Sequence, residues 1–142
     1  MTHQPACVFC KIINEELPAA RLYEDSEVIS FLDINPVNLG HTLVVPRRHY
    51  ELLLDISGDE LGRVMKIIPS IARAVVTATK ADGLNIFQTN KPCAGQTVPH
   101  LHFHVIPRHV HDGFSFGWRQ KKYCGNEMEK MMENIKSILK IE

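Results

Sequence analysis

Histidine alternates with apolar residues over residues 100–105, where the sequence reads His-Leu-His-Phe-His-Val. Successive side chains of an extended strand point to opposite faces of a sheet. The pattern therefore predicts a strand over residues 100–107, with the apolar side chains on the core face and the three imidazoles turned away from the core. Imidazole can act as a nucleophile, a proton carrier or a metal ligand near neutral pH. We therefore expect this strand to carry the chemistry of the protein.

Length and charge narrow the class of protein. The chain has 142 residues, which fits one domain and one core over residues 1–142. Its 16 basic and 16 acidic residues give a formal net charge of zero, which argues against broad binding of nucleic acid. A small phosphorylated ligand stays compatible with this balance, because it needs only a few local donors.

Hydrophobic patterning gives no sign of a membrane protein. No apolar run approaches the roughly 20 residues that a membrane span requires. The first residues also lack the basic start and apolar run of a secretory signal peptide. We therefore expect a cytoplasmic protein without membrane association, in which the four cysteines are reduced.

Turn signals and hydrophobic periodicity divide the chain into strands and helices. A capping-box pattern from Ser57 to Glu60 begins a long helix that should run to about Lys80, and Pro69 should kink it or mark a local break. Strands are predicted at residues 21–24, 27–32, 41–46, 84–89 and 100–107, a short helical turn at 7–14 and a C-terminal helix at 126–139. Short turns between strands, with one long helix between the third and fourth, indicate an α+β fold with a mostly antiparallel five-stranded sheet.

The middle histidine of the run, His102, is the candidate nucleophile. Histidines two residues away on either side can orient it by hydrogen bonding. The preceding loop, residues 94–97, is small and polar, so its backbone amides and the side chains of Gln96 and Thr97 can face an anionic group. This combination suits attack on phosphorus, with a phosphorus–nitrogen bond that water then cleaves and no obligatory divalent ion. The alternatives are a half-exposed strand that happens to hold histidines and a general metal patch.

The segment from Gln96 to Ile106 resembles the signature of the histidine triad superfamily, His-φ-His-φ-His-φ-φ with φ apolar. Residues 31–36 and 40–46 resemble the nucleotide-binding segments of that family. The opening residues 7–13 are similar to those of bacterial members of its Hint branch. The resemblance implies the family's α+β fold and a homodimer in which two five-stranded sheets join into one ten-stranded sheet. Such pairing covers a sheet edge that is otherwise exposed.

The resemblance also implies roles for individual polar residues. By position, His102 is the nucleophile that becomes nucleotidylated, and His104 is the last histidine of the triad, which supports it beside the phosphate. His41 matches a histidine that packs into the same relay. Gln96 and Thr97 match the contacts to the phosphate and the leaving group.

A nucleoside site is implied by the same resemblance. Asp33 matches the acidic residue that binds the ribose hydroxyls, and a carboxylate can accept a hydrogen bond from both hydroxyls of a diol. The residues that correspond to an apolar slot for the base are Val8, Phe9, Ile12, Phe31, Ile34 and Leu43. Taken without the resemblance, each of these six is an ordinary core residue.

The sequence departs from the family pattern before the triad. Many relatives carry Asn where this chain has Thr89, which puts the usual amide contact in doubt. Asn90 follows and can replace it after a small shift of the loop, and we include it among the nucleotide-binding residues. Lys91 stands where Gly is frequent and adds charge at the edge of the pocket.

The C-x-x-C pair formed by Cys7 and Cys10 has no thioredoxin-like strand and helix around it, so redox catalysis is disfavoured. Two further ligands would complete a closed tetrahedral zinc site, and the candidates are His49 and His100. Bacterial relatives with this opening often hold zinc through two cysteines and two histidines at the matching positions. Zinc bound in this way would be structural and would tie the N-terminus to the histidine strand. The alternative is a pair of reduced thiols beside exposed histidines.

The resemblance implies a hydrolase that cleaves purine nucleoside phosphoramidates and releases the nucleoside monophosphate. The sequence His-Leu-His at residues 100–102, in place of the His-Pro-His of related uridylyltransferases, favours a hydrolase over a transferase. A dinucleoside polyphosphate hydrolase and a nucleotide-binding or scaffold protein with incidental activity remain alternatives. DNA-end deadenylation is disfavoured by the zero net charge and the missing C-terminal zinc finger. For Trp118, Phe114 and Phe116, both packing and contact with substrate stay open.

Overall fold

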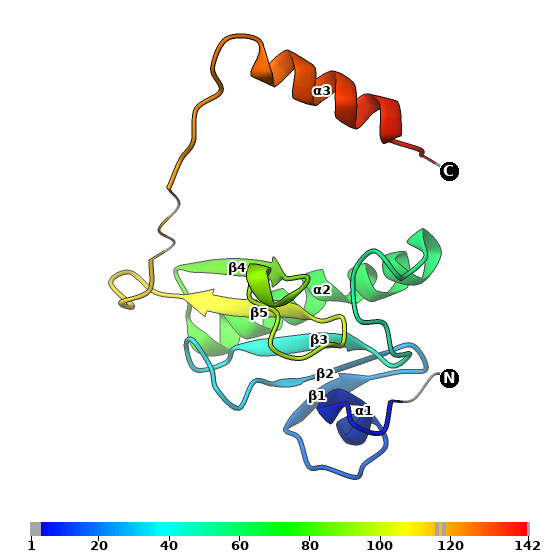
Figure 1. Cartoon of the computed structure of the whole chain (residues 1–142). Coiled ribbons are helices and arrows are strands. Elements are labelled where there is room, and N and C mark those ends of the chain that lie inside the picture. Colours follow the sequence, from blue (N-terminus) through cyan, green and yellow to red (C-terminus); the bar gives the residue numbers. More distant parts are fainter. Residues whose placement is uncertain (1–3, 116, 118, 142) are drawn as a thin grey trace.

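The structure, a computed structural model, describes residues 4–115, 117 and 119–141 (Figure 1). The helices are α1 (Val8–Ile13), α2 (Gly58–Thr79), the short 3-10 helix η1 (Pro92–Ala94) and α3 (Glu127–Ile138). The strands are β1 (Arg21–Glu24), β2 (Val28–Leu32), β3 (Thr42–Pro46), β4 (Gly83–Gln88) and β5 (Phe103–Arg108). Each helix and strand predicted from the sequence is present, and the largest difference in position is at the start of β5.

The five strands form one antiparallel sheet in the order β1-β2-β3-β5-β4. β5 therefore lies between β3 and β4, although it follows both of them in the sequence. α2 packs on one face of the sheet and α1 on the other (Figure 1). This arrangement confirms the predicted α+β fold with a five-stranded antiparallel sheet.

An apolar core lies on each face of the sheet. The core beneath α2 includes Val64, Ile68 and Val75 of the helix and Val44, Phe103 and Val105 of the strands. The core beneath α1 includes Phe9, Ile12, Ile29, Phe31, Leu43 and Val45. Because both faces are covered, every residue of β3 is buried. Full burial of such an aliphatic or aromatic side chain contributes about 1.5–3 kcal/mol, so these two layers hold the sheet between the helices.

Ser57 forms the N-cap of α2 as predicted. The hydroxyl of Ser57 accepts a hydrogen bond from the backbone N–H of Glu60 at 3.3 Å and donates one to the Glu60 carboxylate at 2.9 Å. The helix runs through Pro69 without interruption, so the expected local break does not occur. Pro69 lies on the exposed side of the helix, and packing of the opposite side against the sheet holds the two halves together.

The surroundings of the histidine run differ from the prediction. The strand begins at Phe103, and the side chains of His100 and His102 are only 0% and 4% exposed. The expectation that the imidazoles face away from the core is therefore wrong. The reason is the second apolar layer, because the ring of Phe9 in α1 lies 5.1 Å from the ring of His102 and 5.9 Å from that of His100.

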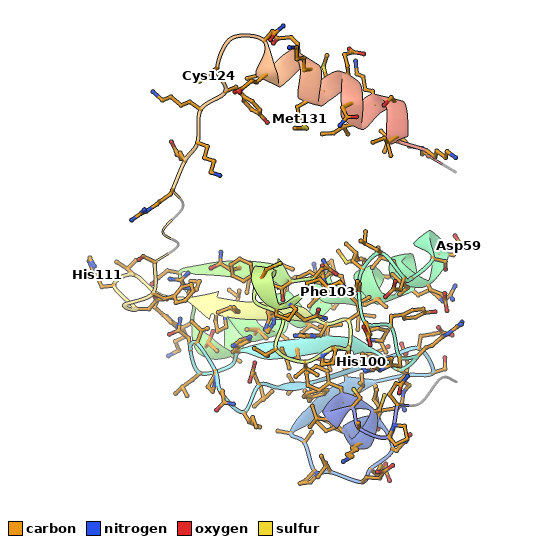
Figure 2. All side chains as sticks on the ribbon, viewed as in Figure 1. Asp59, His100, Phe103, His111, Cys124 and Met131 are labelled. Atoms are coloured by element: carbon orange, nitrogen blue, oxygen red, sulfur yellow. The ribbon has the colours of Figure 1, made fainter. Side chains whose placement is uncertain are left out.

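Residues 119–141, which we call the C-terminal arm, carry α3 and stand apart from the rest of the chain (Figure 1). Figure 2 shows Cys124 and Met131 on this arm, well away from His100 and Phe103 in the body of the molecule. The apolar residues of the helix are all exposed: Met128, Met131, Met132, Ile135, Ile138 and, at its end, Leu139. Among the described helices, none has the length and apolar character needed to cross a membrane.

Candidate active site

A cavity of about 580 Å³ lies where α1 and the loop after it meet the sheet, and we call it the first cavity. Its volume falls within the range of ordinary small-molecule sites. Its lining includes the predicted residues Val8, Phe9, Ile12, Phe31, Asp33, Ile34, Leu43, Thr97, His102 and His104. A slot that is apolar on one side and ends at a carboxylate and two imidazoles suits a ligand with a flat apolar part and a polar or anionic part.

Cross-strand pairing places His104 in the middle of a row of four side chains. Phe31 on β2 is paired with Leu43 on β3, Leu43 with His104 on β5, and His104 with Phe87 on β4. Directly paired residues of neighbouring strands project from the same face of a sheet. His104 is therefore flanked by Leu43, which lines the first cavity, and by Phe87, which does not.

A backbone carbonyl fixes the tautomer of His102. Its Nδ1 atom is hydrogen-bonded to the carbonyl oxygen of His100. A carbonyl can only accept, so Nδ1 carries the proton and Nε2 of the neutral ring holds a free electron pair. Burial lowers the pKa of His102, which keeps the ring neutral at physiological pH. The residue thus has the electronic state that a nucleophile requires.

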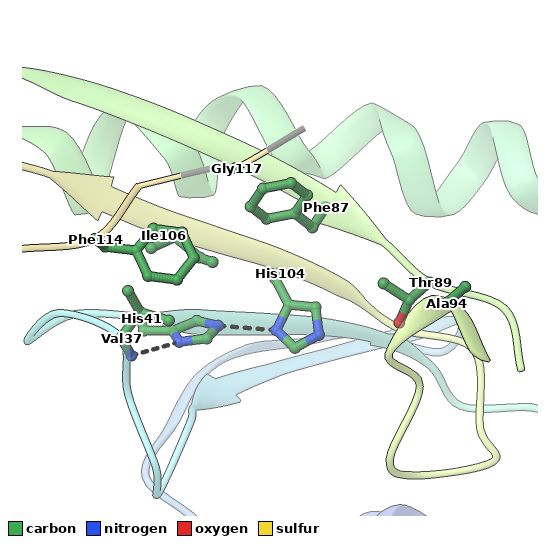
Figure 3. Close-up of a pocket in the computed structure, with 9 residues that line it drawn as sticks. All are labelled: Val37, His41, Phe87, Thr89, Ala94, His104, Ile106, Phe114 and Gly117. Carbon is green, nitrogen blue, oxygen red and sulfur yellow. Dashed lines mark hydrogen bonds between the residues drawn. The ribbon is translucent and has the colours of Figure 1, made fainter. Parts of the chain in front are cut away.

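A second chain of hydrogen bonds fixes the tautomers of His41 and His104 (Figure 3). The backbone N–H of Val37 donates to Nδ1 of His41 at 3.1 Å, so the proton of His41 is on Nε2. That nitrogen lies 2.8 Å from Nδ1 of His104 and donates to it. His104 must then carry its own proton on Nε2, which makes it a hydrogen-bond donor toward an anionic ligand.

The imidazole rings of His41 and His104 are both held neutral. Burial lowers the pKa of His41, although the Asp33 carboxylate, whose oxygen lies 3.6 Å from Nε2 of His41, acts in the opposite direction. Burial also lowers the pKa of His104, to about 4, and the neighbouring imidazoles of His102 and His41 contribute to this shift. At neutral pH the site therefore offers uncharged imidazoles in defined tautomers.

Cys7, Cys10, His49 and His100 form a compact cluster whose ligand atoms all lie within 4.8 Å of one another. Nδ1 of His100 lies 3.4 Å from Sγ of Cys7 and 3.7 Å from Sγ of Cys10. Nδ1 of His49 lies 3.4 Å from Sγ of Cys10 and 3.2 Å from Nδ1 of His100. A tetrahedral zinc ion, with bonds of about 2.3 Å to sulfur and 2.0–2.1 Å to nitrogen, sets its ligands about 3.3–3.8 Å apart. The cluster therefore fits a metal ion, as the sequence predicts.

His100 also links the cluster to the site around His102. Its Nε2 atom donates to the carbonyl of Pro46 at 2.9 Å, which leaves Nδ1 free of its proton and turned toward the cysteines. Its own carbonyl accepts from Nδ1 of His102. One residue thus contributes its side chain to the cluster and its backbone to the nucleophile.

Asp33, His41 and His104 form a second group close enough for a metal ion. In this group the two imidazole nitrogens that would have to bind a metal already share a hydrogen bond of 2.8 Å. A metal would have to replace that bond, so the geometry favours a proton relay over a metal site here.

A second cavity, of about 450 Å³, opens on the other side of His104 (Figure 3). His41, Phe87, Ile106 and Phe114 contribute to its wall, together with Thr89. The hydroxyl of Thr89 is buried and has no hydrogen-bond partner among the described residues. An unsatisfied buried hydroxyl costs about 1–3 kcal/mol.

The family model for the HIT domain matches residues 14–111. The chain belongs to the HIT family. An uncharacterised HIT-like protein of Methanocaldococcus jannaschii is 50% identical over 130 residues, which cover 92% of this chain and 98% of that protein. A relative from Saccharomyces cerevisiae named adenosine 5′-monophosphoramidase is 36% identical over 135 residues, covering 94% of this chain and 83% of that protein.

Solved structures of HIT proteins share the fold. The crystal structure of a HIT family protein from Bacillus subtilis matches with a TM-score of 0.90 and 36% identity, covering 96% of this chain and 99% of that chain. A zinc-bound histidine triad family protein from Mycobacterium smegmatis matches with a TM-score of 0.73 and 34% identity, covering 94% of this chain and 98% of that chain.

Two predicted polar residues of this HIT protein do not reach the first cavity. The Gln96 amide accepts from the backbone N–H of Lys91 at 2.8 Å and donates to the carbonyl of Glu51 at 2.7 Å, so it braces the loop before the triad. The Asn90 side chain accepts from the N–H of Leu53 at 2.8 Å and donates to the side-chain oxygen of Gln88 at 2.6 Å, so its amide is bonded within the protein.

The second cavity was not predicted from the sequence. Period-two alternation in the predicted strand at residues 84–89 places Phe87 and Thr89 on one face, and this signal was available. The pairing of Phe87 with His104 depends on strand order, which the sequence does not reveal. Among the C-terminal aromatic residues, Phe114 lines this cavity, whereas Phe116 and Trp118 lie outside the described residues.

Proposed function

We propose that this protein hydrolyses purine nucleoside phosphoramidates through a nucleotidyl intermediate on His102 and releases the nucleoside monophosphate. The observation that carries the proposal is the hydrogen bond from Nδ1 of His102 to the carbonyl of His100. It leaves Nε2 with a free electron pair in a ring that lines a cavity of nucleotide size. The name of the yeast relative, an adenosine 5′-monophosphoramidase, supports the same activity.

The reaction follows from the two tautomer assignments. Nε2 of His102 attacks the α-phosphorus, the phosphorus–nitrogen bond of the substrate breaks, and the amine leaves with the electron pair of that bond and a proton from solvent. Nε2–H of His104 donates to a phosphoryl oxygen, where negative charge is concentrated in the transition state. Water then attacks phosphorus, releases the nucleoside monophosphate and regenerates neutral His102. His41 keeps His104 in the donating tautomer throughout.

The first cavity supplies the binding contacts for the nucleoside. One oxygen of Asp33 accepts the backbone N–H of Asn35 at 2.9 Å, which orients the carboxylate toward the ribose hydroxyls. The base packs between apolar side chains of α1 and of β2, among them Phe9, Ile12 and Phe31. Thr97 is the part of the loop before the triad that lines the cavity, and we assign it to the phosphate.

We further propose that Cys7, Cys10, His49 and His100 hold a structural zinc ion. All four positions would be occupied by protein ligands, so the ion would act as a fixed cross-link between α1, the end of β3 and the triad segment. The similar protein from Mycobacterium smegmatis is zinc-bound, which supports this choice of metal. Cys7 and Cys10 form no disulfide in the structure, so both sulfur atoms are available to a metal ion.

We propose that the protein acts as a homodimer. β1 and β4 are the edge strands of the sheet, and exposed edges of a sheet are usually covered in native assemblies. The apolar side of α3 is exposed along its length in the single chain. Exposed apolar patches of this kind mark interaction sites, and we assign this one to the second subunit.

The test compares initial rates on adenosine 5′-phosphoramidate and on diadenosine polyphosphates, for the wild type and for His102→Ala. We expect rapid turnover of the phosphoramidate by the wild type and a loss of at least about 10³-fold in the variant. After rapid quenching in alkali, which preserves the acid-labile phosphorus–nitrogen bond, mass spectrometry of the wild type should detect the nucleotidyl adduct on residue 102.

Other outcomes would replace the proposal. Faster turnover of the polyphosphate would favour the dinucleoside polyphosphate hydrolase. Activity that survives His102→Ala would refute the nucleophile assignment. Nucleotide binding without turnover by the wild type would favour the binding or scaffold protein.

A further inference from the structure

The second cavity is an apolar feature beside the triad that the proposed reaction does not use. It lies on the same face of the sheet as the first cavity, and both cavities include His104 in their lining. In the cross-strand row, Leu43 is on one side of His104 and Phe87 is on the other. A substrate whose phosphorus lies at His104 can therefore place one end in each cavity.

Two walls of the second cavity are set by the strands. Phe87 is paired with His104 across β4 and β5, so its ring projects beside the imidazole (Figure 3). Ile106 follows His104 by two positions on β5 and therefore projects from the same face. The sheet therefore determines the direction in which both side chains project.

The third wall, Phe114, is fixed by an ion pair. Arg108 contacts the carboxylate of Asp112 through two nitrogens, at 2.6 and 2.8 Å. The same guanidinium donates to the carbonyl of Phe114 at 2.6 Å, and its central carbon lies 4.8 Å from the centre of the Phe114 ring. Asp112 in turn accepts the backbone N–H of Phe114 at 3.1 Å. The aromatic wall is thus preorganised although it belongs to a loop.

The lining is apolar except for a few neutral groups. Two imidazoles and the Thr89 hydroxyl are its polar side chains, and none of the described Asp, Glu, Lys or Arg residues lines it. The Thr89 hydroxyl is itself buried and has no hydrogen-bond partner in the described part of the chain. A charged group gains no ionic partner from the described lining, whereas an apolar group is removed from water by contact with it, so the chemistry favours an apolar group.

We propose that the second cavity receives the leaving amine of the substrate and that Phe87 and Phe114 select amines with an apolar substituent. This inference rests on the proposed phosphoramidate hydrolysis at His102. In an in-line displacement the leaving nitrogen lies opposite the attacking Nε2 of His102, so it must point away from the nucleophile. The amine nitrogen then points away from His102, in the direction of Ile106, and its substituent occupies the apolar space between Phe87 and Phe114.

The experiment measures kcat/KM for three adenosine 5′-phosphoramidates: the unsubstituted compound, the N-benzyl compound and the N-(4-aminobutyl) compound. We expect the wild type to prefer N-benzyl over N-(4-aminobutyl) by at least about tenfold. Phe87→Ala and Phe114→Ala should each lower the ratio of N-benzyl to unsubstituted turnover by about tenfold. Ile86→Ala is the matched control, because Ile86 is next to Phe87 on β4, is 41% exposed and lines neither cavity.

The outcomes separate this inference from the proposed function. If the wild type turns over the unsubstituted compound but the ratio is the same in Phe87→Ala and Phe114→Ala, the amine subsite is refuted and the hydrolase remains. If these variants instead change the sedimentation coefficient and leave the ratio unchanged, a second copy of the chain occupies the cavity and the inference is also refuted. If no phosphoramidate is turned over by the wild type, the proposed function fails first. Because Phe114 lies in an exposed loop, its variant keeps the test valid even if Phe87→Ala unfolds.

Discussion

Nε2 of His41 lies 2.8 Å from Nδ1 of His104, and the backbone N–H of Val37 determines which of these two nitrogens carries the proton. A peptide N–H cannot accept a hydrogen bond. The backbone of Val37 therefore sets the donor-to-acceptor direction of the hydrogen bonds from Val37 through His41 to His104. His104 is consequently a donor at Nε2, while His102, whose Nδ1 donates to a carbonyl, has a free electron pair at Nε2. Two histidines two residues apart thus have opposite roles.

Replacement of His41 should separate the donor function from simple packing. In His41→Leu the proton of His104 is no longer fixed on Nε2, and we expect kcat to fall by about 10²-fold. In His41→Gln the side-chain amide can still donate to Nδ1 of His104, so kcat should fall by only about tenfold. Steady-state rates on adenosine 5′-phosphoramidate measure both values. Equal losses of kcat in the two variants would contradict the assigned direction of the hydrogen bond from His41 to His104.

Acid should destabilise the protein through His104. Burial lowers the pKa of this residue to about 4 in the folded state, against 6.5 for an ordinary histidine. Between these values the unfolded chain binds a proton that the folded chain does not, so stability is full above about pH 6.5 and falls as the pH drops to about 4.

Urea denaturation at pH 7 and at pH 4.5 measures this effect, with His104→Asn as the comparison. The wild type should lose about 1–3 kcal/mol more than the variant between the two pH values. Loss of metal and titration of other groups in acid affect both proteins, so they cancel in the difference. An equal loss in both would exclude His104 as the source.

Removal of the proposed zinc ion should loosen α1 and therefore the packing of Phe9 against His102. Phe9 of α1 packs against the rings of both His100 and His102, and Cys10 belongs to the same helix. We expect a chelator, or Cys10→Ser, to lower Tm by at least about 5 °C and to abolish bound zinc in elemental analysis. Cys93→Ser changes an exposed cysteine away from the cluster and should retain both zinc and Tm. A Cys10→Ser protein with full zinc content would rule out the assigned ligand set.

Asp33→Asn should weaken recognition of the ribose. The neutral amide keeps the size of the side chain but loses the charge that strengthens hydrogen bonds from a diol. KM for adenosine 5′-phosphoramidate should rise by about tenfold, while the 2′-deoxy analogue, a poorer substrate for the wild type, should be affected less. Asp59→Asn, at an exposed position of α2, provides the control. Undiminished preference for ribose in Asp33→Asn would remove this residue from the ribose site.

The exposed side of α3 should be needed for dimerisation. Sedimentation equilibrium of the wild type should give about twice the chain mass of 16.1 kDa. Met131 and Ile135 lie one turn apart and are 47% and 56% exposed in the single chain, so Met131→Glu/Ile135→Glu should shift the equilibrium toward the monomer. Glu133→Lys changes the charge of the same helix outside this apolar row and should leave the mass unchanged. A monomeric wild type would refute the dimer.

Local sequence signals predicted most of the fold. The N-cap at Ser57 and the alternation in the strands depend on neighbouring residues, and both are seen in the structure. The burial of His100 and His102 could not be predicted in this way. Alternation assigns side chains to a face but does not reveal what covers that face, and here the cover is Phe9 near the other end of the chain.

The first cavity and the metal cluster could be predicted from the sequence, whereas the second cavity could not. The resemblance to a known family supplied the residues of the first cavity and the cluster around His100, because each occurs at a recognisable spacing. The second cavity combines Phe87, which needs the pairing of β4 with β5, and Phe114, which is held by the Arg108–Asp112 ion pair. Such relationships arise from tertiary structure, and no single segment of the sequence encodes them.

The order of strands has a consequence for how the protein is made. β5 occupies the interior of the sheet, between β3 and β4, yet it is the last strand to leave the ribosome. Until residues 103–108 have been synthesised, β4 has no neighbour among the described strands and β3 is paired on one side only. Unpaired, apolar strand edges are prone to aggregate. A nascent chain that stalls before the triad is therefore a natural client for chaperones, and the insertion that completes its sheet is the same event that delivers His104 to the site.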